Sequence, residues 1–138
     1  MDYLKPEMNE AEINQISMLG LAHIGDGVYE LMVRAALCAK GFSAVQELHR
    51  HTTAQVNAAA QARAAERILP SLNEEESAVY RRGRNAHVNS IPHGASVGQY
   101  HAATGLEALF GWLYLQGKTK RLNELFALAA DIMPEKER

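Results

Sequence analysis

The sequence contains little cysteine and has no long apolar run. Its single cysteine, Cys38, excludes an internal disulfide and a thiolate-cluster zinc site, and we expect it to be a buried thiol on a helix. No uninterrupted apolar stretch approaches the roughly 20 residues needed to span a bilayer. Residues 1–7 lack the basic start and apolar core of a signal peptide. These absences predict a cytoplasmic protein with no membrane association.

The alternation of apolar and polar residues that is typical of strands is also missing. The chain has 138 residues, of which 47% are hydrophobic and 22% are charged, so a disordered chain is excluded. Its length fits one domain over residues 1–138. Alanine, leucine, glutamate, glutamine and arginine dominate and favour helix in most windows. The predicted fold class is therefore all-α.

Glycine, proline and capping residues divide the chain into segments. Thr52 and Thr53 offer a junction between two helices, and residues 87–98, which hold two glycines and a proline, predict a loop. The helices that we expect cover residues 8–17, 18–39, 44–51, 53–68, 73–85, 100–116 and 119–132.

The helix expected over residues 18–39 is apolar on two sides. One stripe is predicted to be the core face: Ile24, Val28, Leu31, Ala35 and Ala39. The opposite stripe is Ala22, Asp26, Tyr29, Val33 and Leu37. A helix that is apolar on two sides is buried on two sides. For Tyr29, Val33 and Leu37, contact with a second copy and packing within one subunit both remain open.

Two acidic residues stand where apolar residues are expected. Asp26 interrupts the second stripe, and Glu107 is the only acid between Tyr100 and Gln116. Burying an unpaired carboxylate costs several kcal/mol, so each acid needs a cation, hydrogen-bond donors or a metal ion. If their two helices cross at these positions, the carboxylates form a hard-oxygen site suited to Mg²⁺. A long-range hydrogen bond or ion pair is the alternative.

Glu30 lies one turn after Asp26 and four residues before Arg34, the spacing of a helical salt bridge. We interpret Glu30 as a partner of Arg34 first and as a supporting residue of an acidic site second.

The net charge of −2 does not indicate a nucleic-acid partner, but the charges are unevenly distributed. No Asp or Glu occurs between Glu76 and Glu107. This acid-free stretch contains the basic or polar residues Arg81, Arg82, Arg84, Asn85 and His87. The distribution favours an anionic partner.

Three segments together resemble the catalytic domain of the ribonuclease III family. The first, Leu21-Ala22-His23-Ile24-Gly25-Asp26-Gly27-Val28-Tyr29-Glu30, resembles the family signature. The second segment, Tyr100–Leu115, resembles the second acidic motif of the family. The third, Arg82-Gly83-Arg84-Asn85-Ala86, lies between the other two. With the short length and no double-stranded-RNA-binding domain, this order points to the Mini-ribonuclease III (Mini-III) branch.

The resemblance implies an all-helical homodimer that uses Mg²⁺ to hydrolyse both strands of an RNA duplex. By position, Asp26 and Glu107 are then the catalytic and metal-binding carboxylates. Full-length members carry further acids where this chain has Ala22 and Thr104, a reduction shared by the Mini-III branch. Two carboxylates imply loose Mg²⁺ binding that tightens with RNA, and Thr104 is a supporting candidate. Gly27, where the family usually has a small residue such as Ala, is expected to ease close approach.

The resemblance also favours RNA contact by Arg81, Arg82, Arg84, Asn85 and His87, because duplex RNA is recognised through its backbone and shape. The branch implies maturation of 23S ribosomal RNA precursors, with 5′-phosphate and 3′-hydroxyl product ends and a large-subunit ribosomal protein shaping the substrate.

Two other functions remain as alternatives. One is a non-catalytic ribonuclease III-like dimer that binds structured RNA or a ribosomal partner without cutting. The other is an all-α nucleotide pyrophosphohydrolase that uses Glu74, Glu75 and Glu76, although helix capping also explains these acids.

Overall fold

The computed structural model of the chain describes residues 1–86, 96–130 and 133–136. All regular elements within these ranges are helical, which confirms the predicted fold class. The α-helices are α1 (Glu10–Asn14), α2 (Met18–Ala39), α3 (Val45–Val56), α4 (Ala58–Ile68), α5 (Glu74–Arg84), α6 (Val97–Leu115) and α7 (Thr119–Ala129). A short 3-10 turn, Leu69–Ser71, follows α4. None of the helices described is long and apolar enough to cross a membrane.

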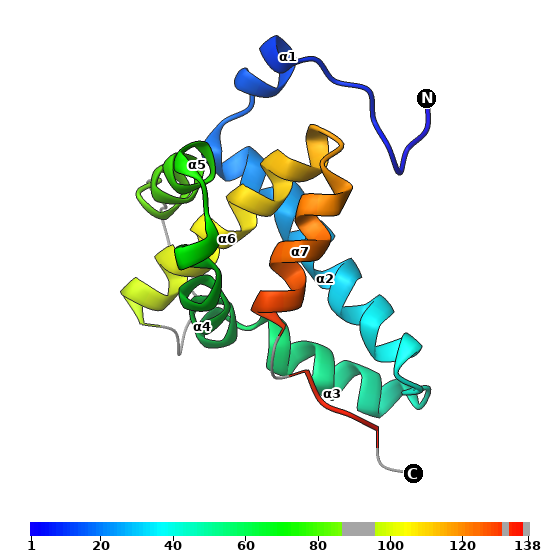
Figure 1. Ribbon diagram of the computed structural model, residues 1–138. Helices are drawn as coiled ribbons and strands as arrows, with labels where there is room; N and C mark the ends of the chain where they lie inside the picture. The colour runs from blue at the N-terminus through cyan, green and yellow to red at the C-terminus, as the bar shows by residue number, and fades with distance from the viewer. Residues whose placement is uncertain (87–95, 131–132, 137–138) are drawn as a thin grey trace.

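Helix α6 forms the centre of the fold, and α2, α4, α5 and α7 pack around it (Figure 1). From Ala103 to Gly111 every residue of α6 is buried except Glu107, which is partly buried. A helix that is apolar on all sides must be covered on all sides. Glu107 is therefore the one acid placed in the middle of the main core helix.

Helix α2 buries the opposite face from the one that its sequence predicts as core. Tyr29, Val33 and Leu37 are at most 1% exposed and belong to the main core cluster, so the dimer-contact interpretation of these residues is wrong. Leu31, from the predicted core stripe, is 60% exposed. Both stripes are apolar, so periodicity alone does not tell which one faces α6. Cys38, which we expected to be buried, is also exposed.

Three expected boundaries differ from the structure because of local capping. The junction between α3 and α4 lies at Asn57, whose side chain accepts a hydrogen bond from the Ala60 N–H at 2.8 Å. The expected junction residue Thr52 is buried within α3. Helix α6 begins at Val97, inside the expected loop, because Ser96 and Gln99 form a capping box. Helix α1 has only five residues.

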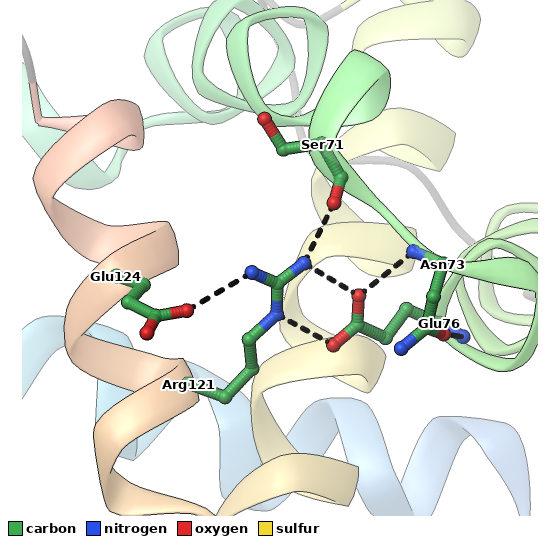
Figure 2. A network of polar contacts seen from close by, with 5 residues as sticks. All are labelled: Ser71, Asn73, Glu76, Arg121 and Glu124. Atoms are coloured by element: carbon green, nitrogen blue, oxygen red, sulfur yellow. Dashed lines mark hydrogen bonds and ion pairs between the residues drawn. The ribbon is translucent and has the colours of Figure 1, made fainter.

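Arg121 of α7 and the buried Glu76 of α5 form an ion pair that joins the two helices (Figure 2). The Arg121 guanidinium donates to the two Glu76 carboxylate oxygens at 2.7 and 2.8 Å and to the Ser71 carbonyl at 2.7 Å. Its hydrogen bonds hold the pKa of Glu76 below its ordinary value. Because Glu76 is committed to this pair and to the cap of α5, the pyrophosphohydrolase alternative loses one of its three acids.

We expect Arg121→Leu to lower the free energy of unfolding by about 2–3 kcal/mol at neutral pH, because it leaves the Glu76 carboxylate buried without a counter-charge. The lowered pKa means that the pair contributes stability above the unfolded pKa of the carboxyl and loses it as pH falls. The loss in the variant should therefore shrink in acid. Urea unfolding at two pH values measures both effects.

Glu124→Gln is the matched control, since it removes only the ion pair between Arg121 and the half-exposed Glu124. Its expected cost is about 0.5 kcal/mol or less. Equal losses in the two variants would contradict the central role of the buried Glu76 contact.

Candidate functional site

The site begins with a close crossing of α2 and α6 at two glycines. A Cβ atom added to Gly25 would lie 1.6 Å from the Glu107 carbonyl oxygen, and one added to Gly111 would lie 2.0 Å from that of Leu21. Only glycine allows the two backbones to approach this closely. A Cβ atom added to Gly27, which we expected to ease the approach, would have no heavy atom within 4 Å, so that expectation is wrong and Gly25 takes the role.

This crossing places Asp26, the neighbour of Gly25, beside Glu107. Asp26 is exposed and Glu107 is partly buried. Burial, a hydrogen bond with Asp26 and the negative charge of Asp26 together raise the pKa of Glu107 to about 9. The sequence predicts that Asp26 and Glu107 come together if their two helices cross. The helices do cross, and the structure brings the two acids together.

Gln61 of α4 is a third member of the site, and sequence reasoning missed it. Its side chain is 3% exposed, and its interaction with the Glu107 carboxyl group lowers the pKa of that group, against the effects of burial and Asp26. Gln61 shares the buried face of α4 with Ala60, Ala64 and Ala65. A long polar residue on an otherwise apolar stripe was the signal that could have found it.

The two supporting candidates have other partners. Glu30 forms its ion pair with Arg34 at 3.3 Å, as the spacing predicts. The hydroxyl of Thr104 is buried and donates to the Tyr100 carbonyl one turn earlier at 3.0 Å. Neither observation places these side chains on the Asp26–Glu107 pair.

A second glycine crossing brings the end of α5 onto α6. A Cβ atom on Gly83 would lie 2.6 Å from the Ala108 Cβ and 3.1 Å from the Gly105 Cα. The last turn of α5, which carries the basic residues, is thus held against the residues of α6 that surround Glu107.

The basic residues of α5 do not all share one environment. Arg81 and Arg84 are exposed, and the Arg84 guanidinium lies 6.0 Å from the Tyr80 ring centre. Asn85 is the exposed C-cap residue. Arg82 is exposed as well, but it also lines a groove between α1, α5 and the end of α6 together with Glu10 and Glu75. His87 lies outside the described residues.

The two carboxylates of Asp26 and Glu107 can make a small number of contacts to a hard divalent cation. Within the described ranges, no three His, Cys, Asp or Glu side chains gather at one point, so Asp26 and Glu107 are alone as acidic donors. Mg²⁺ is commonly held by one or two carboxylates, with water and phosphate oxygens completing its shell. Burial and the negative charge of Asp26 raise the pKa of Glu107, and a bound cation would offset both effects.

Comparisons with known proteins show which family the chain is similar to. A family model described as the ribonuclease III domain matches residues 19–118. The chain is 45% identical to a Mini-ribonuclease 3 of Symbiobacterium thermophilum, over 83% of this chain and 88% of that protein. It is 37% identical to a Mini-ribonuclease 3 of Clostridium tetani, over 96% and 89% of the two chains. A crystal structure of a Fusobacterium nucleatum protein is similar with a TM-score of 0.76 at 30% identity, over 83% of this chain and 92% of that one.

These similarities confirm the resemblance seen in the sequence, for the family and for the helical fold alike. The matched residues include both helices of the crossing and therefore Asp26 and Glu107. The chain belongs to the ribonuclease III family, and its activity is that of an endoribonuclease.

Proposed function

We propose that this protein is an Mg²⁺-dependent endoribonuclease that cuts double-stranded RNA at the Asp26–Glu107 pair. The observation that carries the proposal is the α2–α6 crossing at Gly25 and Gly111, which brings two acids from distant parts of the chain together. Asp26 is open to solvent, so a phosphate on a bound duplex has access to the pair.

In this proposal Asp26 and Glu107 hold the metal ion and orient the scissile phosphate. Bound Mg²⁺ would supply activation of water and neutralisation of phosphoryl charge. Glu107 must be ionised to act as a ligand, and its closeness to Asp26 and its burial favour the protonated form. Binding of a cation and loss of the Glu107 proton are therefore coupled. The products carry 5′-phosphate and 3′-hydroxyl ends.

Cutting both strands of a duplex requires two sites, which a two-fold symmetric homodimer of this single domain over residues 1–138 supplies. The exposed face of α2 is the surface that we propose for the dimer contact, in place of Tyr29, Val33 and Leu37. Its residues Ile24, Val28 and Leu31 line an apolar groove of about 610 Å³. The mass in solution, measured by sedimentation equilibrium, tests this arrangement.

The in vivo substrate that we propose is the 23S ribosomal RNA precursor, cut in the cytoplasm with a large-subunit ribosomal protein bound to it. The Mini-ribonuclease 3 name of the relatives supports the activity, and the substrate follows from the branch that the sequence resembles.

A labelled RNA duplex incubated with the protein, with Mg²⁺ and with chelator, tests the proposed function. We expect Mg²⁺-dependent staggered cuts on both strands, with ends that can be mapped. Tight binding without cleavage would instead support the non-catalytic dimer, the alternative that the missing acids at Ala22 and Thr104 keep open.

For RNA contact, we expect Arg81→Ala together with Arg84→Ala to weaken duplex binding and to flatten its salt dependence. Each lost phosphate contact should reduce the slope of log K against log [salt] by about one. Both residues are exposed on the last turn of α5. Filter binding at several salt concentrations measures the slope.

Arg82→Ala is the matched control, because Arg82 lines the groove that also contains Glu10 and Glu75. We expect it to change the slope less than either neighbour. An unchanged slope in the double variant would show that this end of α5 does not contact phosphate.

A further inference from the structure

We propose that Gln61 is a positioning residue of the active site, which holds the ionised Glu107 carboxylate in place by donating a hydrogen bond from its side-chain amide. The inference rests on the proposed metal-dependent function and extends it to a residue of a third helix, α4.

The position of Gln61 is the first support for this role. Its side chain is 3% exposed and lies on the face of α4 that packs against α6. Its Nε2 atom is buried, and no acceptor among the described residues satisfies it. Buried amide donors are paired in the great majority of proteins. The Gln61 side chain lies close enough to Glu107 to interact with its carboxyl group, and an ionised carboxylate is the acceptor that the donor requires.

The chemistry of the amide is the second support. A third carboxylate at this position would add to the repulsion between Asp26 and Glu107, and a lysine would take the place of the cation. An amide orients a carboxylate by hydrogen bonding without adding charge.

A role in positioning predicts an effect on metal binding. Residues that orient a metal ligand typically change metal affinity or activity by about ten- to a hundredfold when they are replaced. Gln61→Leu keeps the volume and removes the donor, so we expect its Mn²⁺ affinity to fall within that range. The Mg²⁺ concentration that half-saturates cleavage should rise by a similar factor, while the KM for RNA stays the same.

The experiment titrates the full chain with Mn²⁺ alone, follows free Mn²⁺ by electron paramagnetic resonance, and then measures cleavage against Mg²⁺. Gln55→Leu on α3 is the matched control, since Gln55 is also a buried glutamine but does not influence Glu107. If Gln61→Leu does not fold, Gln61→Asn keeps an amide and withdraws it from Glu107. The expected result is a selective loss of metal affinity in the Gln61 variant.

Two outcomes would overturn the proposal, and they can be told apart. Wild-type Mn²⁺ affinity and Mg²⁺ dependence in folded Gln61→Leu or Gln61→Asn would remove Gln61 from the site and leave the proposed function intact. A wild-type protein that neither binds Mn²⁺ nor cleaves the duplex would overturn the proposed function itself, and this inference with it.

Discussion

Asp26→Asn and Glu107→Gln are each expected to reduce the rate of duplex cleavage by about a thousandfold or more, because each removes a charged ligand from the proposed two-carboxylate metal site. In a site with four acids the remaining ligands can compensate in part. Here the described residues offer no third acid, so the loss of either one leaves a single carboxylate. Single-turnover cleavage at saturating protein measures the chemical step directly.

The Glu107 variant should also change stability in the direction opposite to activity. The folded-state pKa of Glu107 is about 9, against an ordinary 4.5, so the folded state binds an extra proton between these values. Stability therefore falls as pH rises from about 4.5 to about 9. Glu107→Gln removes this dependence and should be about 1–2 kcal/mol more stable than wild type in chelator at neutral pH.

Urea unfolding in chelator at pH 6 and pH 8 checks the stability prediction, with the difference expected to be larger at the higher pH. Glu30→Gln is the matched control, because Glu30 pairs with Arg34 on the surface of the same helix as Asp26. It should cleave at nearly the wild-type rate. Normal cleavage by Asp26→Asn or by Glu107→Gln would exclude that residue from the mechanism.

The sequence was sufficient to find the two acids but not to find how they are held. Asp26 and Glu107 stood out because acids interrupted apolar stripes, and the structure brings them together. Gln61 escaped notice because its amide is uncharged and its helix is rich in alanine. Its role depends on packing between α4 and α6, which no local pattern encodes.

The faces of α2 show a second limit of sequence reasoning. Both stripes of this helix are apolar, and periodicity establishes that they exist without telling which one meets α6. The choice is made by Gly25, because the face that carries it is the one on which another backbone can approach. Gly25 and Gly27 are two residues apart and cannot be distinguished by composition. Only the crossing shows that one is in contact and the other is not.

Gly25→Ala is therefore expected to be the most damaging small substitution in the chain. The new methyl group would meet the Glu107 carbonyl oxygen at 1.6 Å and the Gly111 nitrogen at 2.8 Å, and both atoms belong to the backbone of α6. No side-chain rotation relieves such a clash, so the helices must separate. Overpacking of this kind costs about 3 kcal/mol or more. Separation of the helices also moves Asp26 away from Glu107, so cleavage should be lost even where the variant still folds.

Gly27→Ala is the matched control, one residue beyond Asp26 on the same helix. Its Cβ meets open space, and an alanine stabilises a helix interior by up to about 1 kcal/mol relative to glycine. The thermal unfolding temperature should therefore fall in Gly25→Ala and rise in Gly27→Ala. Cleavage is compared with wild type for Gly25→Ala alone, because Gly27 lines the groove proposed for the dimer contact. If Gly25→Ala folded with wild-type stability and activity, the backbone contact between α2 and α6 would not be what places the two acids. Because the same added methyl group is compared at two positions of one helix, propensity is held constant and the difference isolates the crossing.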